Sequence, residues 1–461
     1  NAQLDASTGS SDTHLTLASQ SASKEANTYC TIPVVTNEGL SASMANNVLR
    51  NLSEFTYRSF ELENGSVTSG FWNSDFLYRG LDGERMFADE DLYCQVILTE
   101  DTNGDGVMDW QDGANALKIL VEDKIPGSEV VQNSFVHIGY NFASVVQHPF
   151  LKIADNLKRL SNLIDGFDQT LLFKGYASEG HDSGHADYAN INERAGGAED
   201  MELMAHEAAK INATVGVHIN HSEAYPEAKM FTSEVMSTKN GWAWLDQSKY
   251  IRRDVDILNG GMDSRLDDMF EAVPDIGFVY VDTYRDDRWT AARIAQNLTE
   301  KHGAVMATED GSKLDRWVAW VHGPSFGDGM HRFVYNQQKD VYGSSTLFRG
   351  GYNRAGQNTF MSWQHANNIN NSLKQFYTEQ LPQKYLMHYD VRKMTSTQAD
   401  FEKNVVSKNV NGTNQIYKDG KLIADGSLIF IPWYDEDSET KDPDEAAKIY
   451  HWNPNGGETT W

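Results

Sequence analysis

Two acidic residues, Asp282 and Glu309, each end a short apolar run, and a segment of helix length lies between them. The runs are Ile276-Gly-Phe-Val-Tyr-Val-Asp282 and Gly303-Ala-Val-Met-Ala-Thr-Glu309. A strand, a helix and a second strand in this order form the repeating unit of a β/α barrel, whose strands all end at one rim. A retaining glycosidase needs two such acids, one as nucleophile and one as acid/base. An acid after a strand can also cap the next helix, and the two runs alone leave both interpretations open.

The middle of the chain, residues 131–388, alternates between strand-like and helix-like segments. Apolar runs at 134–140, 169–174 and 214–220 predict strands, and the last of these is apolar enough for a strand covered on both faces. Residues 198–211 carry apolar side chains at helical spacing. This alternation predicts an α/β fold with a catalytic (β/α)8 TIM-like barrel.

The two flanks of the predicted barrel have a different pattern. Residues 1–130 contain short β-like pieces broken by Gly and Asn, which predict an N-terminal β-rich module. Residues 389–461 contain strands and tight turns, which predict a C-terminal β module of the β-sandwich type, complete or truncated at Trp461. The chain begins at Asn1 rather than Met, which we interpret as a processed product or a fragment of a longer protein.

The composition excludes several classes of protein. The 461 residues are 40% hydrophobic and 11% aromatic, enough for a large core, which excludes global disorder. A net charge of −27 argues against nucleic acid or an anionic membrane as partner, and is typical of a secreted or cell-surface protein. No apolar run approaches the roughly 20 residues that a membrane span requires. The two cysteines, Cys30 and Cys94, could form a disulfide or remain separate thiols.

The segment Asp101-Thr-Asn-Gly-Asp-Gly-Val-Met-Asp-Trp-Gln-Asp112 has the pattern of a calcium-binding loop. Oxygen-bearing side chains fall at positions 1, 3, 5, 9 and 12, position 7 offers its carbonyl, and Gly106 lies at the sharp turn. The alternative is an acidic turn rich in Asn and Gly. We predict a structural Ca²⁺ with these ligands: Asp101, Asn103, Asp105, Val107, Asp109 and Asp112.

A polar segment, His181-Asp-Ser-Gly-His185, follows the second predicted strand. The ordinary interpretation is a polar loop with capping residues. His181 and His185 are four residues apart, so together with His218 they could also bind zinc. Gly184 disfavours a helix here, and no glutamate stands in the His-Glu-x-x-His arrangement of metalloproteases.

Two tryptophans, Trp242 and Trp244, stand two residues apart in the turn-rich segment Asn240-Gly-Trp-Ala-Trp-Leu-Asp246. Exposed aromatic rings can stack on the apolar faces of pyranose sugars. Large aromatic side chains are more often buried, so the residues alone favour a core position for both.

Taken together, these motifs resemble glycoside hydrolase family 101, the endo-α-N-acetylgalactosaminidases. The resemblance runs from about Asp101 to Trp461 and follows the order of the family's motifs. Besides the calcium loop, the matching segments are Asn141-Phe-Ala-Ser, His148-Pro-Phe-Leu, Gly180-His-Asp-Ser-Gly-His185, Asn192-Glu-Arg-Ala-Gly-Gly197, Gly216-Val-His-Ile-Asn220, Glu223-Ala-Tyr-Pro-Glu-Ala228, Gly241-Trp-Ala-Trp-Leu-Asp-Gln247, Tyr280-Val-Asp282, Ile431-Pro-Trp-Tyr434 and Tyr450-His-Trp-Asn453.

The resemblance implies a role for each candidate residue. Asp282 is the implied nucleophile and Glu309 the acid/base. The implied substrate is Galβ1,3GalNAc α-linked to Ser or Thr of a mucin-type O-glycoprotein, released whole with retention. Sugar contacts are implied for the hydroxyl-binding Asp182 and His218, the aromatic lid of Trp242 and Trp244, and Gln364.

This chemistry requires Glu309 to hold a proton and Asp282 to stay ionised, with the two carboxyls about 5–5.5 Å apart. The chain departs from the family pattern in the short, charged segment 283–289 and in Asp310-Gly311 after the acid/base. These departures concern the details of the substrate. Three alternatives remain: a retaining α-glycosidase for another α-linked amino sugar or terminal GalNAc, a catalytically impaired O-glycan-binding protein, and a zinc hydrolase.

Overall fold

A computed structural model of the chain describes most of its length. The described residues are 2–6, 14–17, 26–30, 33–36, 39–46, 55–73, 78–85, 93–120, 125–284, 288–309, 314, 317–322, 328–341, 347, 361, 369–430 and 449–451. Among them, no helix is both long and apolar enough to cross a lipid bilayer.

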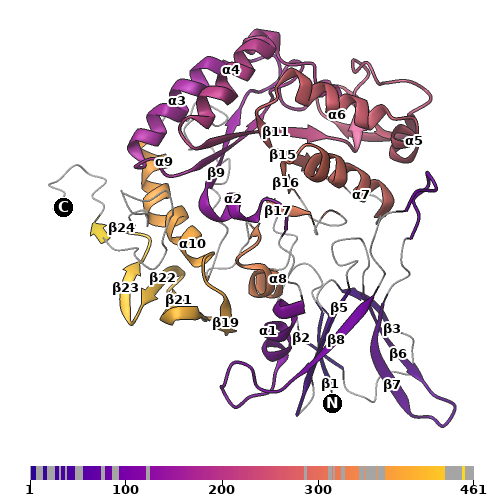
Figure 1. The fold of residues 1–461 in the computed structure, drawn as a ribbon, viewed down its shortest axis with the longest axis vertical. Helices are drawn as coiled ribbons and strands as arrows, with labels where there is room; N and C mark the ends of the chain where they lie inside the picture. Colours follow the sequence, from indigo (N-terminus) through magenta and orange to yellow (C-terminus); the bar gives the residue numbers. More distant parts are fainter. Residues whose placement is uncertain are drawn as a thin grey trace.

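The centre of the described structure is a sheet of seven parallel strands (Figure 1). Their spatial order is β18-β17-β16-β15-β11-β10-β9, and every neighbouring pair is parallel. The carboxyl ends of all seven strands therefore lie at the same end of the sheet. The predicted α/β fold is confirmed. The strands are β9 (Phe135–Tyr140), β10 (Gln169–Lys174), β11 (Ala213–Asn220), β15 (Ile276–Asp282), β16 (Val305–Thr308), β17 (Val318–Val321) and β18 (Asp340–Val341).

Helices lie along the outside of this sheet (Figure 1). In α3, Phe150, Ile153 and Leu157 recur at helical spacing and are fully buried, whereas Lys152 between them is exposed. The helices of this region are α2 (Ser128–Asn133), α3 (Phe150–Leu163), α4 (Gly197–Ala209), α5 (Arg253–Leu258), α6 (Gly261–Ala272), α7 (Arg288–Gln296), α8 (Asp328–Tyr335), α9 (Ile369–Gln375) and α10 (Leu381–Leu386). Shorter turns are the 3₁₀ helix η1 (Glu193–Ala195) and the π-helical η2 (Asn297–Lys301) and η5 (Phe376–Gln380).

Between β18 and α9, at residues 342–368, the structure describes only residues 347 and 361. The Tyr140 N–H donates a hydrogen bond to the Met361 carbonyl over 3.0 Å. This contact places residue 361 beside the edge of β9 that none of the described strands covers. An eighth strand there would lie between β9 and β18, so the closed eight-stranded barrel stays a prediction.

The N-terminal region forms two antiparallel sheets, as predicted for a β-rich module. One has the order β2-β1-β4-β5-β8 and the other β3-β6-β7. Helix α1 (Trp110–Leu120) packs on β4, β5 and β8 and also on α8 and β19, so it joins all three regions of the chain. The strands are β1 (Ala2–Ala6), β2 (His14–Leu17), β3 (Ala26–Cys30), β4 (Pro33–Thr36), β5 (Ser41–Asn46), β6 (Phe55–Glu61), β7 (Val67–Asn73) and β8 (Cys94–Thr99).

The first residue of β8, Cys94, is a free thiol. Of the two alternatives for the cysteines, the structure therefore favours separate thiols. The side chain of Cys30 lies outside the described part of the chain.

The C-terminal region is a five-stranded antiparallel sheet in the order β19 to β23, followed by the pair β24-β25. Lys418 pairs with Lys421 across a two-residue turn in which Asp419 and Gly420 have φ of 49° and 77°. This is the hairpin that the Asp-Gly sequence predicts. Residues 431–448 and 452–461 lie outside the described residues, and with them the motif Ile431-Pro-Trp-Tyr434 and the second half of the motif Tyr450-His-Trp-Asn453. The strands, with one 3₁₀ turn, are β19 (Val391–Met394), β20 (Gln398–Phe401), η6 (Glu402–Asn404), β21 (Val405–Val410), β22 (Thr413–Lys418), β23 (Lys421–Ala424), β24 (Leu428–Phe430) and β25 (Ile449–His451).

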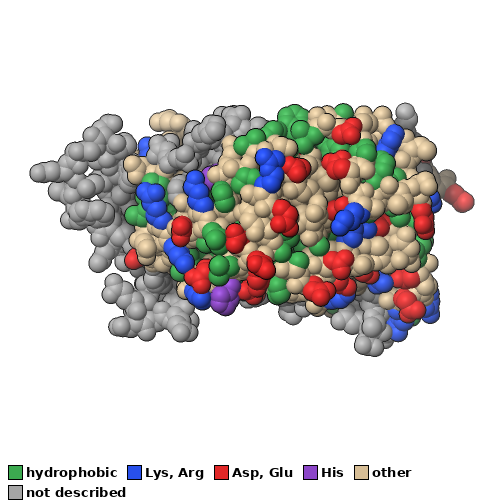
Figure 2. Space-filling model, turned by 90° about the horizontal axis from the view of Figure 1, so that it is seen from above, with side chains coloured by type: hydrophobic (Ala, Val, Ile, Leu, Met, Phe, Trp, Pro, Cys, Tyr) green, Lys and Arg blue, Asp and Glu red, His purple; other side chains and the backbone are tan. Residues whose placement is uncertain are grey.

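On the face seen in Figure 2, acidic side chains lie among basic and apolar ones. The charged side chains on this face are therefore mixed rather than gathered in one acidic patch. A dispersed negative charge opposes non-specific binding to polyanions without creating a steering field of one sign.

Candidate active site

The alternation of side chains along each parallel strand brings polar groups to the inner face of the sheet. On β15, Val279 and Val281 pack in the core shared with the outer helices, whereas Phe278 and Tyr280 belong to the inner core. Asp282 continues the inner series because side chains two apart share a face. The same alternation of inner and outer side chains applies to the neighbouring strands. The inner side chains at the carboxyl ends are Tyr140, Lys174, His218, Asn220, Asp282 and Glu309.

Asp282 and Glu309 form a pair at this rim. Val281 stands opposite Thr308 in the register of β15 and β16, so the two acids that follow lie side by side. Their carboxyl groups are hydrogen-bonded to each other, closer than the expected separation of about 5–5.5 Å. A sugar ring held between the two acids would require a wider separation than this contact.

The buried position of Asp282 controls its protonation. Burial raises the pKa of the Asp282 carboxyl group, the charges of Lys174 and His185 and the hydrogen bond with Glu309 lower it, and Asp182 raises it. The net pKa is raised, which differs from the expectation of a simply ionised Asp282. Asn220 Nδ2 donates to Asp282 Oδ2 over 3.2 Å and supports the ionised form.

Lys174 is a site residue that the sequence prediction missed. It ends β10, its side chain is buried, and its Nζ lies 4.7 Å from the centre of the Tyr280 ring. Its positive charge lowers the pKa of Asp282. The sequence did hold a signal, because Lys174 is a polar residue at the end of a buried apolar run, as Asp282 is.

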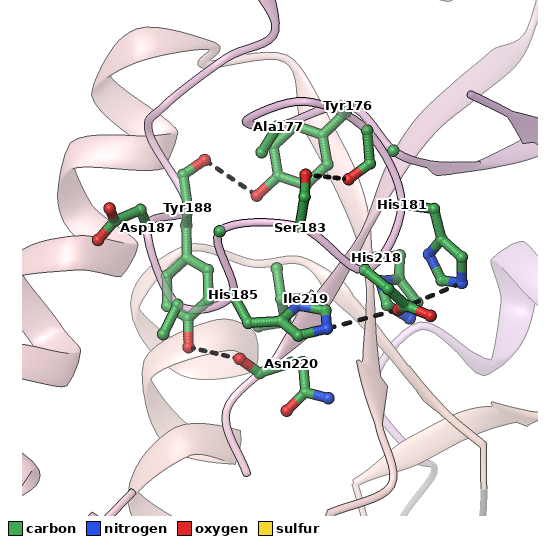
Figure 3. Close-up of a pocket in the computed structure, with 15 residues that line it drawn as sticks. Tyr176, Ala177, His181, Ser183, His185, Asp187, Tyr188, His218, Ile219 and Asn220 are labelled. Atoms are coloured by element: carbon green, nitrogen blue, oxygen red, sulfur yellow. Dashed lines mark hydrogen bonds and ion pairs between the residues drawn. The ribbon is translucent and has the colours of Figure 1, made fainter. Parts of the chain in front are cut away.

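Asp182 lies on the loop after β10 and contacts two histidines, His181 and His185, which Figure 3 labels. Its Oδ1 is 3.3 Å from His181 Nε2 and 3.4 Å from His185 Nε2. Burial acts to raise the pKa of Asp182, but the hydrogen bond from His185 and the neighbouring histidines lower it below its ordinary range. Burial also lowers the pKa values of His181 and His218 well below the ordinary range, so both rings are neutral near pH 7. Asp182 is thus an ionised acceptor beside the neutral imidazoles of His181 and His218.

The predicted zinc ligands are only partly brought together. Ligand atoms of His181, Asp182 and His218 lie within 4.8 Å of one another, whereas His185 is directed at Asp182. His218 Nε2 also lies 3.7 Å from Asp282 Oδ2, and the charge of Lys174 acts on the same ring. A cation beside the ring disfavours a second cation, so this geometry argues against the zinc alternative.

Trp242 and Trp244 lie on an antiparallel hairpin outside the parallel sheet, in a small sheet of order β12-β14-β13. Its strands are β12 (Glu223–Ala224), β13 (Met236–Ala243) and β14 (Gln247–Ile251). The two residues are 57% and 46% exposed, and their rings stack with centroids 6.4 Å apart. The core position that the residues alone favoured is therefore wrong, because the hairpin leaves both indoles in solvent. The exposed stack fits the implied lid.

The predicted calcium loop is wound around Asp101. The Asp101 carboxylate accepts hydrogen bonds from the N–H groups of Gly104, Asp105 and Gly106, and both glycines have a positive φ. This winding fits the first half of a calcium loop. The second half of the loop fits less well. The Asp112 carboxylate, at position 12, accepts hydrogen bonds from the N–H groups of Thr102 and Asp109 instead of being open to an ion.

We expect Ca²⁺ to raise the thermal midpoint of the protein relative to a chelator by about 2–5 °C, because an ion that binds only the folded loop adds to stability. Lys393 Nζ lies 2.6 Å from Asp105, so Lys393→Ala should increase this shift by removing a competing cation. Differential scanning calorimetry measures both effects. Asp101→Ala should abolish the shift. Equal midpoints in Ca²⁺ and chelator for the unmodified protein would contradict the calcium prediction.

Three elements of the predicted site are outside the described residues. These are Gln364, Asp310 and residues 285–287 of the charged segment. Their roles stay predictions.

Comparison with known proteins identifies the family of the barrel region. Residues 111–373 match the family model described as endo-alpha-N-acetylgalactosaminidase. Residues 379–461 match the glycosyl hydrolase 101 beta sandwich domain, and residues 1–110 match a galactose mutarotase-like fold domain. A protein of Renibacterium salmoninarum, named "Putative endo-alpha-N-acetylgalactosaminidase", is 35% identical over 422 residues. The match covers 86% of this chain but only 27% of that relative.

Solved structures of low sequence identity share the fold. Alpha-N-acetylgalactosaminidase NagBb from Bifidobacterium bifidum, in a GalNAc complex, has a TM-score of 0.54 at 12% identity, covering 90% of this chain and 80% of that one. The alpha-galactosidase AgaA A355E from Geobacillus stearothermophilus has a TM-score of 0.51 at 7% identity, covering 95% and 67%. By its catalytic and β-sandwich domains, the chain belongs to glycoside hydrolase family 101, the endo-α-N-acetylgalactosaminidases.

Proposed function

We propose that the chain is a retaining endo-α-N-acetylgalactosaminidase that releases Galβ1,3GalNAc from Ser or Thr of mucin-type O-glycoproteins. The observation that carries this proposal is the adjacent Asp282 and Glu309 pair at the rim of a family 101 barrel. Because the chain spans about a quarter of its curated relative, regions beyond it could add to substrate recognition.

In the proposed reaction, the single proton shared by the pair divides the roles of the two acids. Glu309 donates the proton to the glycosidic oxygen while Asp282 attacks the anomeric carbon, which forms a glycosyl-enzyme and frees the Ser or Thr hydroxyl. Glu309 then takes a proton from a water that attacks the same carbon, so two inversions give net retention. A pair that holds one proton between like charges supplies an acid and a base at the same pH.

The surrounding residues suit recognition of a sugar. Ionised Asp182 can accept hydrogen bonds from two hydroxyls, and neutral His218 can accept or donate one. Lys174 lowers the pKa of the carboxylate that attacks. The exposed indoles of Trp242 and Trp244 offer a platform for the apolar face of a pyranose ring.

We further propose a structural role for Ca²⁺ in the loop at 101–112 and a secreted or cell-surface location, where mucin glycans are found. The fit of the first half of the loop supports the first of these proposals. The net charge of −27 supports the second.

An assay on Galβ1,3GalNAcα-aryl tests the function. We expect release of the intact disaccharide, first as the α-anomer, which proton NMR distinguishes from the β-anomer before mutarotation. Release of GalNAc from GalNAcα-aryl but no disaccharide would indicate the exo-acting alternative. Tight binding without turnover would indicate a glycan-binding protein, and initial β-anomer would overturn the retaining mechanism.

A further inference from the structure

The hairpin that carries Trp242 and Trp244 is held by one buried carboxylate. Glu223 Oε2 accepts hydrogen bonds from the Trp242 N–H over 2.5 Å and from Ser248 Oγ over 2.6 Å. Glu223 is 7% exposed and Ser248 is fully buried. The carboxylate therefore forms hydrogen bonds with both strands of the hairpin close to its turn, although the indoles that it supports are exposed to solvent.

These hydrogen bonds lie where the pairing of the two hairpin strands is irregular. The register of β13 and β14 shifts between Asn240 and Ala243, so the strand ladder is interrupted at Trp242. The Glu223 carboxylate takes the hydrogen bond of that N–H instead. Gly241 permits this approach, because a Cβ there would lie 1.9 Å from Glu223 Oε2.

The same segment is tied to the catalytic pair. Asn220 Oδ1 accepts hydrogen bonds from the N–H groups of Ser222 and Glu223, and Asn220 Nδ2 donates to Asp282. Ser222 Oγ donates to the carbonyl of Thr283, the residue after Asp282. A chain of direct hydrogen bonds thus leads from the reacting carboxylate to the backbone of Trp242.

Resting on the proposed function, we propose that Glu223 is a positioning residue that fixes the Trp242–Trp244 platform at a set height and angle above Asp282. It touches neither the reacting atoms nor the substrate. Its role is to place the indoles where the sugar ring meets them, so it governs substrate affinity and leaves the bond-breaking step to Asp282 and Glu309.

The test compares Glu223→Ala with the conservative Glu223→Gln, which keeps one carbonyl oxygen as an acceptor. For Galβ1,3GalNAcα-aryl, we expect Glu223→Ala to raise KM about tenfold, with kcat within about threefold of the unmodified chain. Glu223→Gln should recover most of that affinity. Exposed Glu234, on the loop before β13, serves as the matched control, and Glu234→Ala should leave both constants unchanged.

A thermodynamic cycle separates positioning from general destabilisation. In a Trp242→Ala background, Glu223→Ala should change KM less than twofold, because the platform it positions is already lost. Gly241→Ala offers a second route, since its methyl group pushes Trp242 from an intact Glu223, and it should raise KM in the same way. Unchanged KM in both Glu223→Ala and Gly241→Ala, or full additivity with Trp242→Ala, would overturn the proposal.

A binding experiment distinguishes failure of the proposed enzymatic function from failure of the positioning role of Glu223. If the unmodified chain turns over no disaccharide, indole fluorescence during titration with Galβ1,3GalNAc still reports whether Glu223→Ala weakens binding about tenfold. If the chain binds the disaccharide, Glu223→Ala weakens that binding, and no hydrolysis occurs, then the positioning role of Glu223 stands and the proposed enzymatic function is wrong. Equal affinity of both forms would overturn the positioning role alone.

Discussion

Asp282→Asn is expected to lower kcat on Galβ1,3GalNAcα-aryl by about 10⁴-fold or more, because an amide cannot form the glycosyl-enzyme. Glu309→Gln should lower kcat about 10²–10⁴-fold on an O-glycopeptide, whose poor leaving group needs a proton. With a nitrophenyl leaving group the loss for Glu309→Gln should be much smaller, since that group departs without protonation. Steady-state kinetics on the two substrates measures the difference.

Azide distinguishes the two roles by stereochemistry. Added to Glu309→Gln, it should attack the glycosyl-enzyme and give the α-glycosyl azide, whereas in Asp282→Asn it should replace the nucleophile and give the β-glycosyl azide. Asp275, at the opposite end of β15, is the matched control, and Asp275→Asn should keep kcat near that of the unmodified chain. Equal losses on both leaving groups for Glu309→Gln would contradict its role as the acid.

The parts of this site that could be predicted are those controlled by strand periodicity. Asp282 and Glu309 end buried parallel strands, and a two-residue period fixes the face on which such side chains lie. The parallel order β15-β16 then makes them neighbours. The same reasoning would have selected Lys174 and Asn220, but a search restricted to acids for catalysis passes over them.

Other features depend on contacts that no periodicity encodes. Asp182 lies on a loop with a φ of 59°, and its partners are two histidines whose positions depend on the folding of that loop. Trp242 lies on β13, Trp244 lies in the turn that follows, and their rings stack. Whether that stack meets the core or solvent depends on the tertiary position of the hairpin, and here the general preference of Trp for burial gave the wrong answer.

The protonation of the pair is also a tertiary property. The sequence suggested an ionised Asp282 beside a protonated Glu309, but burial raises the pKa of Asp282 and the two carboxyls are hydrogen-bonded. Lys174 opposes this effect of burial from a strand that is more than 100 residues away in the chain. The balance between burial and this one cation decides how readily Asp282 becomes a nucleophile.

Replacing Lys174 by Met is therefore expected to lower kcat/KM, by up to about 10²-fold, on the acidic limb of its pH profile, where the ionised fraction of Asp282 limits the rate. Lys174 lowers the pKa of Asp282, so its removal raises that pKa. Only the ionised carboxylate attacks, and activity is lost as the pH falls through its pKa. The acidic limb of the kcat/KM profile should move to higher pH by about 1–2 pH units, the effect of one charge at close range.

The charge-conserving variant separates electrostatics from packing. Lys174→Arg keeps a cation beside Asp282, so its acidic limb should stay near that of the unmodified enzyme even if the larger side chain lowers kcat. Lys174→Met should regain part of its activity at higher pH, until Glu309 loses its proton. A uniform loss at every pH, with an unmoved acidic limb, would mean that Lys174 acts by contact with the sugar and not through the carboxylate. Because Lys174 also packs on Tyr280, thermal midpoints of both variants show whether the inner core survives the change.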